Sequence, residues 1–212
     1  MSSIVPLAFD FQSTTPCDPR VIDAMEPYWR DNWGTPSSSH NRLGISASAA
    51  VNLSREVIAS KLGIQPKGLI FTSGATEANN LALLGYVRAK AIESGRKGHL
   101  ITLSTEHRAV LEPLRQLEKE GHDLTELCPD SSGILNVDDL KRAIREDTIL
   151  LSLMLGNNEI GVVQPLEIVS QLCKEKKIVL HSDVVQAFGQ LPLDPYKLGI
   201  DILTISAHKI YG

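Results

Sequence analysis

The stretch Asp201-Ile202-Leu203-Thr204-Ile205-Ser206-Ala207-His208-Lys209-Ile210-Tyr211-Gly212 joins a short apolar run to a group of polar side chains. Residues 202–205 predict a buried strand, and Ser206, His208 and Lys209 follow at the point where it would emerge. In open α/β sheets, ligands bind beyond the carboxyl ends of the strands. A desolvated lysine there loses its charge readily and becomes a nucleophile toward carbonyls. A surface lysine after a strand is the commoner alternative, so the rest of the chain must decide.

Length and composition are those of an ordinary globular protein. The 212 residues suffice for one large domain, or for one domain and part of another. Apolar residues make up 42% and charged residues 22%, and the net charge of -4 argues against a nucleic-acid partner. No stretch approaches the roughly 20 apolar residues of a membrane span, and residues 1–10 lack a signal or transit pattern. We therefore expect a cytoplasmic protein without a membrane partner.

The three cysteines, Cys17, Cys128 and Cys173, are far apart and odd in number. This spacing predicts neither a disulfide framework nor a metal site, and it fits a reducing compartment. Cys173 falls on a predicted helix beside Leu172, where we expect it to be part of the core.

Strand and helix patterns alternate along the chain, which predicts an α/β fold with a mostly parallel sheet flanked by helices. Asp18 and Pro19 begin a predicted helix that runs to about residue 30, and Gly63 ends another that covers residues 45–62. Further helices are expected after residues 75 and 108, after the cap Asn136 and after Pro165, with Pro113 starting or kinking the second of these. The predicted strands cover residues 7–11, 69–71, 99–103, 123–127, 149–155, 178–180 and 202–205.

Small residues follow the strand predicted at residues 69–71. Ser73-Gly74-Ala75-Thr76 leads into a helix, where free N–H groups and the helix dipole favour an anion such as a phosphate. A plain strand-to-helix turn capped by its own side chains is the alternative.

Polar side chains also follow three other predicted strands. His107 comes after residues 99–103, although a lone histidine is usually structural. Asn157 comes after residues 149–155, in a segment that Gly161 also marks as a turn. Asp183 and Gln186 come after residues 178–180, and a carboxylate in such an apolar setting needs a donor.

Together these groups are a phosphate site, an aromatic ring, a carboxylate and an amine. Pyridoxal 5'-phosphate (PLP) uses all four, because its aldehyde binds a lysine, its pyridine nitrogen an acidic partner and its phosphate a helix N-terminus. The combination is far more specific than any of its members.

At these residues the chain resembles a cysteine desulfurase of the class V aminotransferase family, whose members are fold type I PLP enzymes. The matching stretches cover nearly the whole chain in the family's order: Ser13-Thr14-Thr15-Pro16, Pro36-Ser37-Ser38-Ser39-His40, Phe71-Thr72-Ser73-Gly74-Ala75-Thr76-Glu77, Thr105-Glu106-His107, Asn157-Asn158-Glu159-Ile160-Gly161, His181-Ser182-Asp183 with Gln186-Ala187, and Ser206-Ala207-His208-Lys209-Ile210-Tyr211-Gly212.

The resemblance implies a role for each polar group. Lys209 forms the Schiff base with PLP and moves the substrate's Cα proton, and His107 stacks on the pyridine ring and takes part in proton transfer. The remaining implied contacts are those of Asp183 with the ring nitrogen, of Gln186 with the ring hydroxyl, of Asn157 with cofactor and substrate, and of Ala75, Thr76, Ser206 and His208 with the phosphate.

The resemblance also implies that this chain is the N-terminal portion of a longer protein, because family members are nearly twice as long. Residues 1–15 would belong to the small domain and residues 16–212 to the PLP-binding large domain, incomplete after Lys209. The other half carries the persulfide-forming cysteine, an arginine for the substrate carboxylate and a threonine that reaches the partner subunit's cofactor. None of the three cysteines here matches the position of the persulfide cysteine.

The activity implied is transfer of sulfur from L-cysteine to a protein thiolate, with release of L-alanine, for iron–sulfur cluster assembly or another sulfur-transfer pathway. It implies a homodimer and a sulfur-acceptor or scaffold partner, and an isolated fragment that is inactive. Selenocysteine lyase or another class V enzyme stays open, because these enzymes share the cofactor half. A non-catalytic truncated homologue that acts as a binding or regulatory protein also stays open.

Overall fold

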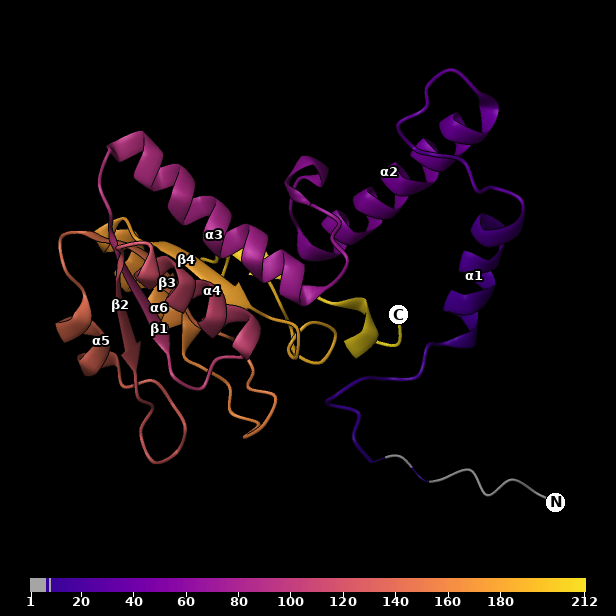
Figure 1. Cartoon of the computed structure of the whole chain (residues 1–212). Coiled ribbons are helices and arrows are strands. Elements are labelled where there is room, and N and C mark those ends of the chain that lie inside the picture. Colours follow the sequence, from indigo (N-terminus) through magenta and orange to yellow (C-terminus); the bar gives the residue numbers. More distant parts are fainter. Residues whose placement is uncertain (1–6, 8) are drawn as a thin grey trace. The chain divides into compact units, whose positions relative to one another are not determined.

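The computed structural model describes residue 7 and residues 9–212, and the described chain forms two compact units (Figure 1). Unit 1 consists of the described residues up to Ile70 together with Ala207–Gly212. Unit 2 is Phe71–Ser206. The division into domains predicted at residue 15 concerns the complete protein and stays a prediction.

Unit 2 is built on a five-stranded sheet in which every pair of neighbouring strands is parallel. The strand order is β2-β1-β3-β4-β5, so the chain starts near one edge and ends at the other. This sheet confirms the predicted fold class. The strands are β1 (His99–Leu103), β2 (Asp123–Leu127), β3 (Thr148–Ser152), β4 (Val179–Asp183) and β5 (Ile202–Thr204).

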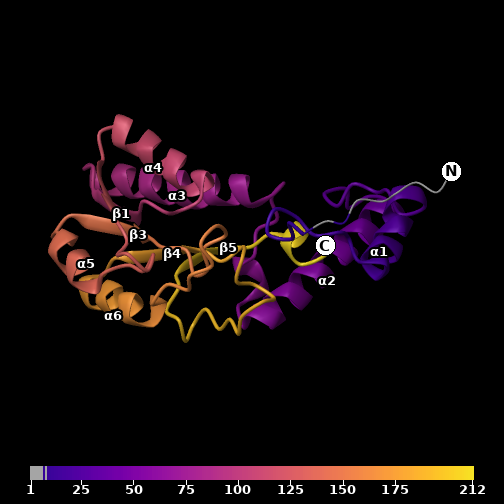
Figure 2. The same cartoon turned by 90° about the horizontal axis from the view of Figure 1, so that it is seen from below.

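Helices cover both faces of this sheet, with α3 and α4 on one side and α5 and α6 on the other (Figure 2). The connections between parallel strands need such crossovers, and covering both faces explains why β1 and β3 are buried along nearly their whole length. The helices are α3 (Ala75–Ser94), α4 (Arg108–Lys119), α5 (Val137–Ala143) and α6 (Leu166–Lys176). Asn136 caps α5 as predicted, whereas Pro113 lies inside α4 and does not start it.

The core of unit 2 has two parts because successive side chains of a strand point to opposite faces. Leu100 and Leu150 pack with apolar residues of α3 and α4, while Ile101 and Leu151 belong to the cluster on the α6 side. Cys173 of α6 is 1% exposed in this second cluster, as predicted. Its burial raises the pKa of the thiol to about 12, so the side chain acts as a small apolar group.

Unit 1 contains α1 (Pro19–Arg30), α2 (Arg42–Leu62) and two short 3₁₀ turns, η1 (Pro66–Gly68) and η2 (Ala207–Lys209). Asp18 caps α1 by accepting the main-chain N–H of Arg20, and Pro19 is its first residue. Gly63 ends α2 in the left-handed conformation, with φ 67°. These three signals were predicted from the sequence and are confirmed.

Two predicted strands are wrong. The described residues 7 and 9–11 form no strand, and position 8 lies outside the described residues. Residues 69–71 form no strand either, because the main chain there bonds locally. The Leu69 carbonyl accepts the Arg55 guanidinium and its N–H donates to the carbonyl of Pro66. A strand forms only where a second strand takes up its main-chain groups, and the described chain offers none here.

The apolar run at residues 149–155 is longer than the strand it contains. β3 ends at Ser152, three residues before the predicted end. The chain nevertheless follows β4 further, because the N–H of Leu153 donates to the His181 carbonyl and that of Leu155 to the Asp183 carbonyl. The chain after β3 therefore reaches the end of β4, at Asp183, before the polar turn begins.

Candidate functional site

Asp183 is the last residue of β4 and is 5% exposed. Its Oδ2 accepts a hydrogen bond of 2.8 Å from Nδ2 of Asn79 on α3, and its Oδ1 accepts one of 3.0 Å from the N–H of Val185. A buried carboxylate is expensive unless such donors hold it, and both bonds favour its charged form. β4 therefore ends in a fixed acidic group inside the fold.

The N-terminus of α3 has no side-chain cap, because the residue at the cap position is Gly74. Its φ of 158° and ψ of 179° lie in a region that is essentially restricted to glycine. Glu77, in the first turn of α3, accepts the N–H of Ser73 at 2.5 Å and so fixes the turn that precedes the helix. The first N–H groups of the helix, at Ala75 and Thr76, thus face away from any cap and suit an external anion.

Asn79 places this helix end close to Asp183. It is one turn after Ala75, or about 6 Å along the helix axis, and it holds the carboxylate directly. Its own Oδ1 is buried and has no hydrogen-bond partner among the described residues. Such an unpaired acceptor costs stability, so it marks this place as one where polar groups remain for a ligand or water.

His107 is exposed and is also the N-cap of α4. Its Nδ1 accepts the N–H of Ala109 at 3.1 Å, so a neutral ring carries its proton on Nε2. His107 therefore has a structural role, that of a helix cap, as is usual for a lone histidine. It leaves the ring face and Nε2 outside that bond, and the cap holds the ring in one orientation.

Asn157 is buried, and its amide is fully engaged. Nδ2 donates to the Thr105 carbonyl at 2.8 Å, and Oδ1 accepts the N–H groups of Glu159 and Ile160 at 2.8 and 3.0 Å. The turn interpretation of this segment is thus correct, and Gly161 adopts a φ of 71° within it. The same amide ties the turn after β3 to the loop that carries His107.

The other predicted residues of unit 2 lie at the same ends of their strands. Gln186 is half-buried in the turn three residues after Asp183. Ser206 follows β5, whose Thr204 is paired in register with Asp183. Unit 2 therefore brings together the ends of β1, β3, β4 and β5 with the start of α3, as the parallel topology requires.

His208 and Lys209 belong to unit 1 and lie in η2. Lys209 Nζ donates to the carbonyls of Ser13 and Gln12, at 2.6 and 2.5 Å. His208 Nδ1 is 3.1 Å from Thr14 Oγ1. Within their own unit, both side chains face the N-terminal segment at residues 12–15.

Glu106 is a completely buried carboxyl group in the loop between β1 and α4, and sequence reasoning assigned it no role. Its Oε1 accepts the N–H of Met154 at 2.6 Å, and Oε2 has no partner among the described residues. Burial raises the pKa of Glu106 well above its usual value, and the nearby charge of Asp183 raises it further. Burial therefore favours the neutral, protonated form of the Glu106 carboxyl group.

His181 is a second buried titratable group close to Asp183, two residues earlier on β4. Its Nδ1 is 2.8 Å from Ser152 Oγ, and burial lowers the pKa of the ring to about 4. It is therefore neutral at physiological pH. Burial thus favours the neutral forms of both Glu106 and His181, the two titratable neighbours of Asp183.

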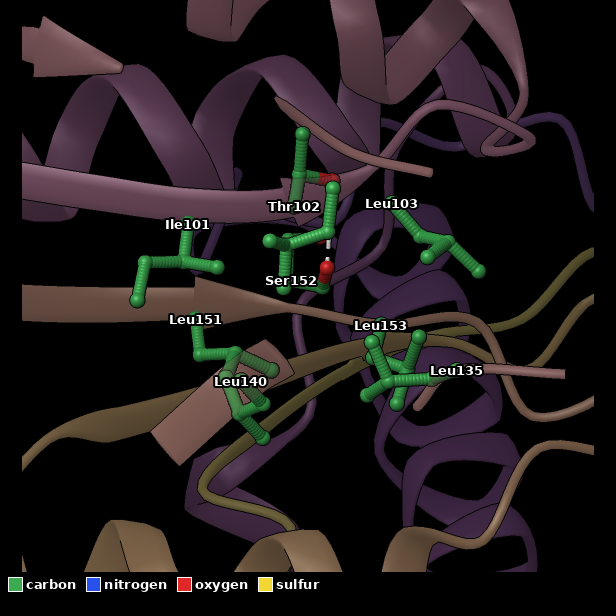
Figure 3. A pocket seen from close by; sticks show the side chains of 9 residues that line it. Ile101, Thr102, Leu103, Leu135, Leu140, Leu151, Ser152 and Leu153 are labelled. Atoms are coloured by element: carbon green, nitrogen blue, oxygen red, sulfur yellow. Dashed lines mark hydrogen bonds between the residues drawn. The ribbon is translucent and has the colours of Figure 1, made fainter. Parts of the chain in front are cut away.

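One apolar cavity inside unit 2 is too small for a ligand. A cavity of about 10 Å³ lies between β1, β3 and α5, lined by apolar side chains with Thr102 and Ser152 at its side (Figure 3). This volume is at the limit for a single water molecule, so the cavity is a packing void.

Among the described residues, no group of three or more His, Cys, Asp or Glu side chains is arranged to hold a metal. No helix in the described part of the chain is long and apolar enough to cross a membrane.

The uncapped helix end, the buried carboxylate and the polar strand ends lie at one edge of the parallel sheet of unit 2, which is an α/β domain. The chain belongs to the aminotransferase class V family, which matches residues 7–212. The family that the motifs indicate is thereby confirmed.

Known relatives of the chain are cysteine desulfurases. It is 47% identical over 207 residues to the mitochondrial cysteine desulfurase of Candida maltosa, an alignment that covers 98% of this chain and 42% of that protein. It is 46% identical over 208 residues to the cysteine desulfurase IscS of Rickettsia africae, covering 98% and 50%. The chain thus spans about half the length of the curated relatives it matches.

Solved structures agree with this assignment. A structure titled "SspA in complex with cysteine" superposes with a TM-score of 0.92 at 39% identity, covering 98% of this chain and 58% of that one. A structure titled "NIFS-LIKE PROTEIN" superposes with a TM-score of 0.91 at 37% identity, covering 98% and 56%. The chain therefore shares its fold with somewhat more than half of each of these proteins.

Proposed function

We propose that the complete protein is a PLP-dependent cysteine desulfurase. It takes sulfur from L-cysteine as a protein persulfide, releases L-alanine and passes the sulfur to an acceptor protein for iron–sulfur cluster assembly or another sulfur-transfer pathway. The observation that carries the proposal is the buried Asp183 carboxylate, which Asn79 holds one turn from the uncapped start of α3.

The residues of unit 2 fit the polar groups of PLP. Asp183 supplies the acidic partner that keeps a proton on the pyridine nitrogen, and the N–H groups at Ala75 and Thr76 supply donors for the phosphate. When bound, the cofactor supplies an electron sink for negative charge at the substrate's Cα. Burial favours the neutral forms of Glu106 and His181, whereas the Asp183 carboxylate accepts two hydrogen bonds, and this supports Asp183 as the acidic partner.

We assign the other predicted residues as follows. Lys209 supplies the amine that binds the cofactor aldehyde and carries the Cα proton. His107 packs its ring against the pyridine ring and moves protons at Nε2, since Nδ1 is engaged in the helix cap. Gln186 contacts the ring hydroxyl, Asn157 shapes the loop beside the ring, and Ser206 and His208 add donors for the phosphate.

The sulfur-accepting thiol is outside this sequence in our proposal. The Cys173 thiol is buried with a pKa of about 12 and cannot supply a thiolate. Cys128 follows the edge strand β2, and Cys17 lies in unit 1 beside the start of α1. The relatives are about twice as long as this chain, and we place the thiol, the substrate-carboxylate site and the homodimer partner contacts in their additional half.

The compartment is also a proposal. The composition fits a reducing, cytoplasmic setting, while relatives at similar identity are named as mitochondrial, mitosomal or bacterial proteins. The relatives named above are cysteine desulfurases, which favours L-cysteine over selenocysteine as the substrate.

The test is the covalent loading of the protein with PLP. Reduction with borohydride should fix the cofactor on the Lys209 peptide, as read by mass spectrometry, and the visible absorption of the lysine-bound form should disappear. Lys209→Ala should abolish both signals. A pyridoxyl label on another lysine, or a visible band that persists in Lys209→Ala, would contradict the assignment.

A second measurement separates the halves of the protein. The 212 residues alone should release no sulfide from L-cysteine, whereas the complete protein should. Turnover by the 212-residue chain would show that its own cysteines suffice, and the placement of the essential thiol would then be wrong.

A further inference from the structure

The segment Ser13-Thr14-Thr15 is held against η2 by hydrogen bonds that cross more than 190 positions of sequence. The N–H and the Oγ1 of Thr15 both donate to the His208 carbonyl, each at 2.9 Å. Thr15 Oγ1 in turn accepts the N–H of Tyr211 at 2.8 Å. One hydroxyl group therefore joins the residues on either side of Lys209 and Ile210.

The backbone at this place needs such support. Tyr211 adopts a φ of 64°, which is uncommon for a bulky residue and persists only where its surroundings hold it. Besides the bond to Thr15, its carbonyl accepts the N–H of Asp18 at 2.9 Å. A 3₁₀ turn of three residues also has weak internal hydrogen bonding. The position of its backbone, from which the side chains extend, therefore depends on contacts with other segments.

We propose that Thr15 is a positioning residue for Lys209. It fixes the main chain before and after the lysine, and thereby the point from which the amine reaches the cofactor. Because Nζ is at the end of a long side chain, a rotation of the main chain at Lys209 moves Nζ further than it moves Cα. The carbonyls of Ser13 and Gln12 complete the arrangement by accepting from Nζ. This inference rests on the proposed role of Lys209 in binding PLP.

The experiment compares Thr15→Val with Thr15→Ser in the complete protein. Valine keeps the shape but removes the hydroxyl, whereas serine keeps the hydroxyl. Thr35→Val is the matched control, because Thr35 is exposed in the same unit and its described bond is made by its main-chain carbonyl. Should Thr15→Val fail to fold, Thr15→Ala removes the same hydroxyl without placing a branched apolar side chain there.

Two readouts are needed. Without cofactor, hydrogen exchange at the Tyr211 amide should be faster in Thr15→Val and unchanged in Thr15→Ser and Thr35→Val. With PLP, the rate of appearance of borohydride-trapped cofactor on Lys209 should fall about ten- to a hundredfold in Thr15→Val, the effect expected for a reacting group displaced by up to about 1 Å. Thr15→Ser should retain the wild-type rate.

The outcomes distinguish this inference from the proposed function. Capture of PLP by Thr15→Val at the wild-type rate, or equal loss in Thr15→Ser, would overturn the positioning role. If the wild-type protein itself traps no PLP on Lys209, the proposed function fails instead. Exchange at the Tyr211 amide that is unchanged in Thr15→Val would separately overturn the hydrogen-bonded arrangement.

Discussion

Replacing Glu106 by Gln tests the electrostatics of the candidate site without removing its structure. Glu106 Oε1 accepts the buried N–H of Met154 at 2.6 Å, and the glutamine carbonyl oxygen can accept it in the same way. We therefore expect the variant to differ by no more than about 1 kcal/mol in unfolding free energy at low pH. Glu106→Leu, in contrast, leaves that N–H unpaired and should cost about 1–3 kcal/mol.

The decisive effect is on pH dependence. The unfolded chain releases the Glu106 proton near the usual pKa of 4.5, while burial makes the folded chain keep it to a higher pH. The free energy of unfolding then falls by about 1.4 kcal/mol per pH unit over this interval. This contribution is fully present below the unfolded pKa and is lost as pH rises through the folded pKa. Glutamine has no such proton, so Glu106→Gln should gain stability over wild type as pH rises above 4.5.

The assay is urea unfolding at several pH values above and below the usual glutamate pKa, extrapolated linearly to water. Glu118→Gln is the matched control, because Glu118 is exposed on α4 and its removal leaves the core intact. The difference between Glu106→Gln and wild type should widen with pH, and the Glu118→Gln profile should stay parallel to wild type. Parallel profiles for Glu106→Gln and wild type would refute a protonated Glu106.

Three further results are expected. Gly74→Ala forces a side chain into a glycine-only conformation and should cost about 1–3 kcal/mol in unfolding free energy, measured by urea unfolding. It should also weaken PLP binding, measured by cofactor titration. Gly68→Ala, with open space around it, is the control and should do neither. Thiol labelling read by mass spectrometry should modify the exposed Cys128 in the folded protein but reach Cys173 only after unfolding; early labelling of Cys173 would contradict its place in the core. Asn79→Ala removes a donor to the buried carboxylate and should lower the unfolding free energy by about 1.5–3 kcal/mol, and an unchanged urea midpoint would show that this bond contributes little.

Local signals made most helices predictable from the sequence. Asp18 and Pro19 start α1, Gly63 ends α2 and Asn136 starts α5, because each acts through its own backbone or through a hydrogen bond to a near neighbour. The continuous apolar runs likewise predicted a sheet buried on both faces, since parallel strands lie between layers of helices.

The strand expected at residues 69–71 shows where this reasoning fails. Its residues favour a strand, but the main chain of Leu69 bonds to Arg55 and Pro66. Propensity is a property of the segment, whereas pairing requires a second segment at the right place. The contacts of α3 with β4, and the bond between Asn79 and Asp183, place the helix start near the carboxylate without that strand.

By itself, the sequence determined the family and the order of polar residues along the chain, and it predicted the cofactor class, because motif residues carry these in their chemistry. Only the tertiary structure decided that Asn79 holds Asp183, that burial raises the pKa of Glu106 and that Thr15 bonds to the turn of Lys209. Each of these depends on burial or on a contact between residues far apart in sequence. Glu106 stands among polar neighbours and Thr15 beside a turn, so no local pattern distinguishes them from surface residues. Folding gives both residues their partners and buries Glu106 away from water, and these changes determine their chemistry.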